Sequence, residues 1–196
     1  RCFDIMKREC AFTIEQVLIH YEPEELERWK QGDPEVVPPE VLLWQGLGRQ
    51  NGYGYAEHLV ARMLKAQNYE LILEDYNLFP VKTTKFSENN KLIEAVLGPE
   101  KYSLLQRALG LFSDAGIRIE LPDICVLSPE FHFIEVKRDS DRLRAPQELF
   151  AAVVSSIFSI RFMIYKVLPV GNEWNTSPLQ CKQMLPEAVL QLKEKS

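Results

Sequence analysis

Two short apolar runs, joined by a tight turn and bordered by charged residues, constrain the fold of this chain more than any other feature. The runs cover residues 124–127 and 131–134 and are rich in β-branched and aromatic side chains, with Ser128-Pro129-Glu130 between them as a turn signal. Strands joined so tightly pair antiparallel. The sequence therefore predicts a hairpin that brings Asp123, at the start of the first strand, near Glu135, at the end of the second.

The second strand of this hairpin carries its two charges on one face. Side chains alternate along a strand, so Glu135 and Lys137 project together and Val136 projects from the opposite face. Phe131 and Phe133 share the face of the charges, which therefore continue an apolar stripe. Charged pairs on solvated strand faces are common, but a carboxylate and an amine at the end of an apolar stripe favour a reactive centre.

Hydrolysis of a phosphodiester is the chemistry that this residue set suits. The reaction requires shielding of the anionic phosphate, activation of water and stabilisation of the leaving alkoxide. Asp123 and Glu135 can hold Mg²⁺ or Mn²⁺, with water, the Val136 carbonyl and phosphate oxygens as further ligands. Lys137 can orient or deprotonate the attacking water. We therefore predict metal-dependent catalysis by these residues.

Gln147 is a fourth catalytic candidate. Pro146 suits the first turn of a helix, and Phe150, Ala151 and Val154 follow Gln147 at helical offsets, so the amide faces the apolar side. The amide can bind the attacking water, a metal ligand or the DNA backbone. The alternative is a hydrogen bond that only closes the helix end.

A basic segment follows the predicted metal site directly. The whole chain has a net charge of −5, but residues 1–50 hold ten acidic and six basic side chains, so the remainder carries only −1. Arg138, Arg142 and Arg144 are predicted to bind DNA phosphates, which supply most non-specific affinity. The alternative is a solvated loop in which Asp139 and Asp141 form internal ion pairs with these arginines.

Together these motifs resemble a known signature. Pro122-Asp123 followed by Glu135-x-Lys137 is similar to the motif of the PD-(D/E)XK nuclease superfamily. Residues 134–147, with the sequence IEVKRDSDRLRAPQ, are most similar to its VRR-NUC branch, the virus-type replication-repair nucleases. Members of that branch carry an E-V-K-G-P-x-D-R-L stretch, followed shortly by a glutamine on a helix. This chain has Arg138 and Asp139 where Gly-Pro is typical, and the resemblance covers roughly residues 53–168.

The resemblance implies an α/β fold with a restriction-endonuclease-like core, a central mixed sheet flanked by helices. It also implies that a glutamate on the first core helix completes the metal site. Residues 55–66 have helical periodicity, and Glu57 borders their apolar stripe, so Glu57 is the expected fourth metal ligand beside Asp123, Glu135 and Val136. The alternative is a boundary glutamate paired with Arg62 or with solvent.

The remaining segments predict how the chain is organised. Residues 1–50 are expected to form an N-terminal helical extension, with helices near residues 24–31 and 38–44. Residues 51–196 are expected to form the nuclease-like domain. Helical patterns at residues 88–97 and 100–112 predict a helical insertion in this domain at about residues 83–115.

Other classes of protein find little support in the sequence. No uninterrupted apolar run has the length of a membrane span, and there is no secretory signal at the start. Four scattered cysteines without C-x-x-C spacing argue against a zinc knuckle or a disulfide scaffold. No Gly-x-Ser-x-Gly elbow of a serine hydrolase occurs. We expect an intracellular protein, cytoplasmic or nuclear and not secreted, with no membrane partner.

The sequence thus predicts a Mg²⁺- or Mn²⁺-dependent deoxyribonuclease, selective for DNA structure and linked to DNA repair, replication or recombination. Its expected substrate is branched, flapped or end-containing DNA. An acidic protein has to supplement its grip on DNA through metal, through DNA shape, or through a homodimer or protein partner held by the N-terminal helices. The alternatives are a restriction or mobile-element endonuclease, and a non-catalytic DNA-binding or assembly module that retains the nuclease fold.

Overall fold

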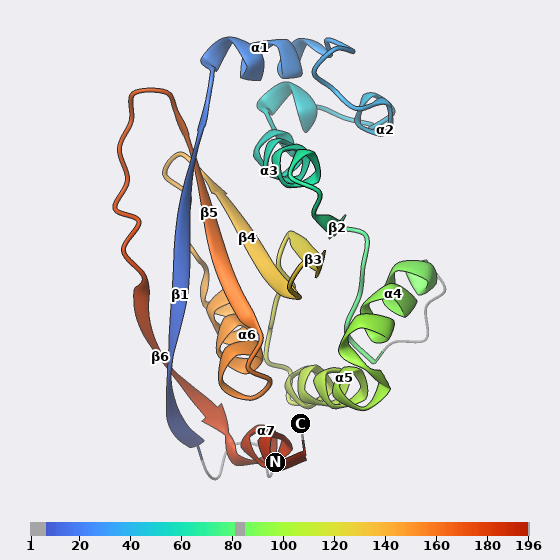
Figure 1. Ribbon diagram of the computed structural model, residues 1–196, viewed down its shortest axis with the longest axis vertical. Helices are drawn as coiled ribbons and strands as arrows, with labels where there is room; N and C mark the ends of the chain where they lie inside the picture. The colour runs from blue at the N-terminus through green and yellow to red at the C-terminus, as the bar shows by residue number, and fades with distance from the viewer. Residues whose placement is uncertain (1–6, 81–84, 196) are drawn as a thin grey trace.

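The protein folds around one six-stranded sheet with helices on both faces (Figure 1). The computed structural model describes residues 7–80 and 85–195. The strands, in chain order, are β1 (Lys7–Tyr21), β2 (Glu70–Leu73), β3 (Ile124–Ser128), β4 (His132–Arg138), β5 (Arg161–Pro169) and β6 (Leu179–Pro186). They lie in the spatial order β2-β3-β4-β5-β1-β6, in which β4, β5 and β1 are mutually parallel and the other pairs are antiparallel. This confirms the predicted α/β class and mixed sheet, and the arrangement is consistent with a restriction-endonuclease-like core.

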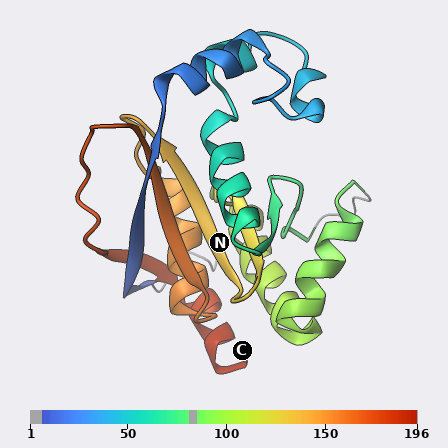
Figure 2. The same cartoon turned by 45° about the horizontal axis from the view of Figure 1, so that its top comes forward.

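The helices divide between the two faces of the sheet. They are α1 (Pro23–Gln31), α2 (Pro39–Leu42), α3 (Tyr55–Ala66), α4 (Ser87–Leu97), α5 (Pro99–Asp114), α6 (Ala145–Ser156) and α7 (Glu187–Leu190), with 3₁₀ turns η2 (Arg49–Asn51) and η3 (Gln191–Lys195). Helix α3 packs against one face of the sheet, and α1, beyond the end of the sheet, adds buried side chains to the same core, whereas α5 and α6 pack on the opposite face (Figure 2). Among the described residues, no helix combines the length and apolarity needed to cross a bilayer.

Strand β4 contributes side chains to both cores, because successive side chains point to opposite faces of the sheet. Phe133 is buried against Phe150 of α6, with ring centroids 5.1 Å apart, whereas Ile134 and Val136 are buried on the α3 side. Because both faces of β4 are covered, residues 132–137 are all buried, although only Phe133, Ile134 and Val136 of them are apolar. Glu135 and Lys137 are therefore buried near the end of the strand, whereas Arg138 is partly exposed.

The N-terminal fifty residues are not the purely helical extension that the sequence predicted. Helices α1 and α2 are present, but residues 7–21 form the long strand β1, which lies between β5 and β6. Phe12 and Ile14 alternate with exposed residues and are buried in the same core as α6. A boundary at residue 50 would therefore remove a central strand from the sheet. Residues 1–6 lie outside the described residues.

The helical insertion predicted at about residues 83–115 is present as α4 and α5, between β2 and β3. Residues 83 and 84 lie outside the described residues. Pro99 begins α5, and Gly98 separates it from α4 at a positive φ of 82°, a conformation that glycine adopts without steric cost. The insertion covers the sheet on the α6 side, because Ile93, Leu105 and Leu109 are buried in that core.

Candidate active site

The hairpin of β3 and β4 places the two predicted carboxylates opposite each other. Ile124 pairs with Ile134, so the next position of the antiparallel register sets Asp123 against Glu135. The Val136 N–H donates a hydrogen bond of 2.8 Å to Oδ2 of Asp123. The side chain of Asp123 thus takes the place of a main-chain partner where β3 has already ended. The predicted convergence of these two carboxylates is confirmed.

A third and a fourth carboxylate complete an acidic cluster. Carboxylate oxygens of Glu57, Glu74 and Asp123 all lie within 4.8 Å of one another. Glu57 comes from the first turn of α3, as predicted, whereas Glu74 follows β2 directly. The Glu74 N–H donates to the Asp123 carbonyl at 2.8 Å, which fixes the two chain segments side by side. Oxygen atoms grouped in this way are the ligands that Mg²⁺ and Mn²⁺ prefer.

Glu135 is held by two donors and keeps one oxygen free of protein partners. Lys137 Nζ donates to Glu135 Oε1 at 2.7 Å, and Gln147 Nε2 donates to the same oxygen at 2.5 Å. The Gln147 Oε1 atom accepts the Arg144 N–H at 3.0 Å, so the amide is fixed at both ends. Glu135 Oε2 is buried and has no hydrogen-bond partner within the described chain. A buried carboxylate oxygen without a partner is costly, and a bound cation would satisfy it.

The electrostatics of the cluster favour a cation. Burial, followed by the negative charge of Glu135, raises the pKa of Asp123 well above its usual range. Burial is also the largest cause that raises the pKa of Glu57, Glu74 and Glu135. The nearby ammonium of Lys137 opposes the shift at Glu135 without cancelling it. Ionised carboxylates that lie close together repel one another, so their grouping does not stabilise the fold. Groups of carboxylates with raised pKa values in one cleft are therefore a common feature of functional sites.

Val136, predicted as a ligand through its carbonyl, borders the same cleft. The N–H and C=O of a strand residue point to the same side of the strand. Since the N–H is bonded to Asp123, the carbonyl also points toward the side where β3 has ended. The backbone geometry therefore permits the predicted role.

The cleft has an acidic floor and a basic rim. It has a volume of about 630 Å³, and its lining includes Glu57, Glu74, Asp123, Glu135, Lys137, Gln147 and the arginines 118, 142 and 144. Glu120 forms ion pairs with Arg118 at 2.6 Å and with Arg144 at 2.8 Å. Arg142 is exposed and forms no hydrogen bond or ion pair with any residue in the ranges 7–80 and 85–195. Arg142 and Arg144 therefore lie beside the carboxylates, as the sequence predicted.

Arg138 does not share this position, contrary to its predicted grouping with the other two arginines. Its Nη1 donates to the Gly52 carbonyl at 2.7 Å, and its Nε lies 3.2 Å from Oδ2 of Asp139. The residue does not belong to the cleft lining. The physical reason is the strand alternation itself, because a residue next to Lys137 on β4 projects from the opposite face. Arg138 joins β4 to the segment before α3.

A buried lysine supports the loop that carries Arg142. Lys166 on β5 pairs in register with Lys137 and is almost fully buried. Its Nζ donates to the Asp141 carbonyl at 2.8 Å and lies 4.4 Å from the centre of the Trp174 ring. Burial lowers the pKa of this lysine. The hydrogen bond and the cation–π contact compensate for the buried charge and fix the loop beside the cleft.

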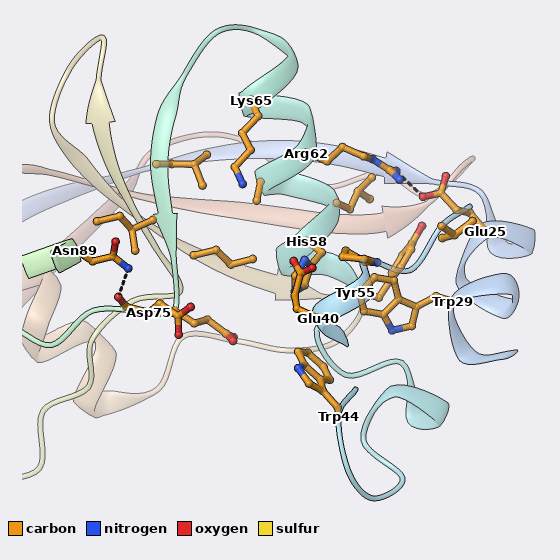
Figure 3. A pocket seen from close by; sticks show the side chains of 18 residues that line it. Glu25, Trp29, Glu40, Trp44, Tyr55, His58, Arg62, Lys65, Asp75 and Asn89 are labelled. Atoms are coloured by element: carbon orange, nitrogen blue, oxygen red, sulfur yellow. Dashed lines mark hydrogen bonds and ion pairs between the residues drawn. The ribbon is translucent and has the colours of Figure 1, made fainter. Parts of the chain in front are cut away.

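A second cavity of about 630 Å³ lies between α1, α2, α3 and β2 (Figure 3). Trp29, His58 and Trp44 line one part of it, and Glu74 borders both this cavity and the acidic cleft. Arg62 forms its ion pair here with Glu25, as the dashed line in Figure 3 shows. The alternative in which Arg62 neutralises Glu57 is therefore wrong, and Glu57 remains part of the acidic cluster.

Six residues that line the cleft were not predicted as site residues from the sequence, among them Glu74, Arg118 and Tyr53. Glu74 directly follows the apolar run Leu71-Ile72-Leu73, and a carboxylate at a strand end was the same signal that identified Asp123 and Glu135. Arg118 lies in the loop between α5 and β3 and has no distinguishing pattern. Tyr53 precedes α3 and lines the cleft, and the negative charge of Glu74 is the largest cause that raises the pKa of its phenol.

No protein-family model and no curated protein matches this sequence. The assignment of a function therefore depends on the residues of the cleft.

Proposed function

We propose that this protein is a Mg²⁺- or Mn²⁺-dependent deoxyribonuclease of the PD-(D/E)XK type, most similar in its motifs to the VRR-NUC branch. One observation carries the proposal. Asp123 lies opposite Glu135 in a cleft where Glu135 keeps a buried oxygen without a partner, and Lys137 donates to the other oxygen at 2.7 Å. A degenerate, non-catalytic copy of such a fold would be expected to have lost at least one of these groups.

The donor set of the cleft fits a hard divalent cation. Asp123, Glu135 and Glu57 would hold it, together with the Val136 carbonyl, and Glu74 is close enough to contribute a further oxygen. When bound, the cation neutralises charge on the phosphate and makes water more acidic. The free Oε2 of Glu135 is the atom on which this fit depends most.

Lys137 and Gln147 position the reacting groups. The Lys137 ammonium is held by Glu135 Oε1 and has further N–H groups with which to orient a water molecule near the phosphate or to stabilise negative charge on it. Gln147 fixes the same carboxylate from α6 and leaves Oε2 facing away from that contact. A glutamate held by two donors keeps one rotamer, which pre-organises the site.

The basic rim accounts for how an acidic protein can hold DNA. Arg142 and Arg144 lie within reach of the cleft, whereas the carboxylates below them repel an unshielded phosphate backbone. Binding then depends on metal and on a small number of arginine contacts. This combination favours selectivity for DNA shape, such as branches, flaps or ends, over tight binding to any duplex.

A cleavage assay tests the proposal. Wild-type protein is incubated with linear, flapped and branched DNA in Mg²⁺, in Mn²⁺ and in EDTA. We expect metal-dependent cleavage of at least one substrate, and a loss of about 10²-fold or more in Glu135→Gln, the scale for removal of a positioned catalytic group. Glu130→Gln is the matched control, because Glu130 lies in the turn at the far end of the hairpin.

The outcomes separate the alternatives. Cleavage at a fixed sequence, with no preference for DNA structure, would favour a restriction or mobile-element endonuclease. Binding to DNA without cleavage in either metal would favour a non-catalytic DNA-binding or assembly module. Equal cleavage by Glu135→Gln and wild type would show that the cleft is not the catalytic centre.

A further inference from the structure

An exposed aromatic side chain stands at the edge of the acidic cleft. Tyr53 lies between η2 and α3 and lines the cleft together with Asp123 and Glu135, yet 58% of its surface is exposed. Tyrosine combines an apolar ring with a polar hydroxyl, so an exposed tyrosine ring at the edge of a polar cleft is well suited to bind a ligand. The contacts around Tyr53 decide whether its ring is held in place for such a role.

The backbone around Tyr53 is held from several directions. Its N–H donates to the Gly48 carbonyl at 3.0 Å, and its own carbonyl accepts the indole N–H of Trp29 at 3.2 Å. The preceding carbonyl, of Gly52, accepts the hydrogen bond from Arg138 at 2.7 Å. The ring is thus presented by a fixed segment, and the cost of ordering it is already met in the free protein.

Glycine on each side of Tyr53 makes this arrangement possible. Gly52 and Gly54 both have a φ of 77°, a region that L side chains rarely adopt. A Cβ atom on Gly52 would lie 2.7 Å from Arg138, and one on Gly54 would lie 2.6 Å from Trp44. The Trp44 ring consequently lies close to the start of α3. It also packs against the ring of Tyr53, with ring centroids 5.7 Å apart.

Two further apolar side chains of the segment before α3 are exposed. Leu43 and Leu47 are 82% and 66% exposed, and Trp44 reaches the cavity of Figure 3 next to His58. Arg142 and Arg144 also line the cleft, and they come from the segment between β4 and α6, whereas Tyr53 comes from the segment before α3. The cleft therefore combines cationic groups that suit phosphate with a ring that suits a flat, uncharged group.

We propose that Tyr53 is a stacking platform for one unpaired nucleobase of the DNA whose phosphate lies at the carboxylates. This inference rests on the proposed nuclease function and adds the substrate class, namely DNA with a single-stranded segment at the cleft. Inside a duplex both faces of each base are covered by neighbouring bases, so an internal paired base cannot lie on the ring, whereas an unpaired base can. Stacking on an aromatic side chain is tolerant of sequence, because every base has a π-face.

Equilibrium binding in Ca²⁺, a hard cation used to hold the complex without cleavage, measures this contact. Wild type, Tyr53→Ala and Tyr53→Phe are titrated into a fluorescent single-stranded oligonucleotide and into a relaxed, covalently closed duplex circle, which has neither unpaired bases nor ends. Tyr53→Ala should bind the single strand about 5- to 150-fold more weakly, the range for loss of one stacked base. Tyr53→Phe keeps the ring and should bind within about twofold of wild type, and duplex binding should not change. Leu92→Ala, at an exposed position of α4, is the control for loss of an exposed apolar side chain.

A scan with abasic nucleotides assigns the base. At one position of the single strand, removal of the base should weaken wild-type binding by the same factor as Tyr53→Ala, and should not weaken Tyr53→Ala further. Equal affinity of wild type and Tyr53→Ala for the intact single strand would overturn the inference. A change in self-association of Tyr53→Ala, with unchanged DNA binding, would also overturn it and assign the surface to a protein partner.

The outcome also separates this inference from the proposed function. If wild type cleaves DNA and Tyr53→Ala binds single strands normally, only the stacking role fails. If wild type binds neither single-stranded nor duplex DNA, the nuclease proposal and the stacking role fail together.

Discussion

Replacing Asp123 by asparagine should make the metal-free protein more stable. Asparagine has almost the same shape as aspartate, and its side-chain oxygen can still accept the Val136 N–H that Asp123 accepts at 2.8 Å. The substitution therefore removes a charge and keeps a hydrogen bond. The amide group gains acceptors in Glu57 and Glu74, whose carboxylates face Asp123 in the cluster.

The size of the effect follows from the spacing of the carboxylates. Two unit charges 4.8 Å apart repel by about 3.5 kcal/mol at an effective dielectric constant of about 20. Exposure of Glu74 and partial protonation of the cluster reduce this repulsion, so we expect a net gain of about 1–2 kcal/mol near pH 7.5. For a chain of 196 residues, such a gain raises the melting temperature by about 2–8 °C.

The effect should depend on pH with a defined sign. Burial and the charge of Glu135 raise the pKa of Asp123 in the folded state. The stability contributed by its protonated form is therefore complete below the unfolded pKa, about 3.9, and is lost as pH rises through the folded pKa. The advantage of Asp123→Asn should be small at about pH 4 and should grow toward pH 8.

Thermal unfolding followed by circular dichroism in EDTA, across this pH range, measures the difference. Asp114→Asn is the matched control, because Asp114 is exposed at the end of α5, outside the cleft. A lower melting temperature for Asp123→Asn near neutral pH would refute the argument from repulsion, as would a gain of the same size at pH 4 and pH 8.

Two further substitutions test the roles of the cationic residues. Lys137→Gln can still donate to Glu135 and should remain folded but lose about 10²-fold or more in cleavage rate, whereas normal cleavage would remove Lys137 from the mechanism. Arg142→Ala should weaken binding to all DNA sequences and lower the slope of log affinity against log salt by about one unit, because one phosphate contact is lost. Arg138→Ala should instead lower the melting temperature and leave that slope unchanged, since its guanidinium binds the Gly52 carbonyl. An unchanged slope in Arg142→Ala would mean that this loop carries only solvated charge.

Short-range patterns were enough to predict the centre of the site. The tight turn before Phe131 fixes an antiparallel register, and that register alone sets Asp123 opposite Glu135. Alternation along β4 then places Lys137 beside Glu135. The same rule, applied one residue further, would have placed Arg138 on the opposite face and separated it from the other two arginines that were predicted to bind DNA.

Contacts between distant segments explain what the sequence did not reveal. The alternation of Phe12 and Ile14 with polar residues is a local strand signal, but the place of β1 inside the sheet depends on its distant partners at residues 163–169 and 179–186. Glu74 joins the cluster only because β2 pairs with β3 and ends beside Asp123. Tyr53 reaches the cleft through hydrogen bonds from Trp29 and Arg138, which lie in other parts of the chain.

Calorimetric titration with Mn²⁺ tests the central claim most directly, because every proposed role in the cleft depends on a cation held by its carboxylates. Wild-type protein should bind Mn²⁺ with saturable heat, and Asp123→Asn should lose that binding while it remains folded. Binding of equal strength by wild type and Asp123→Asn, or no binding by either, would contradict the account.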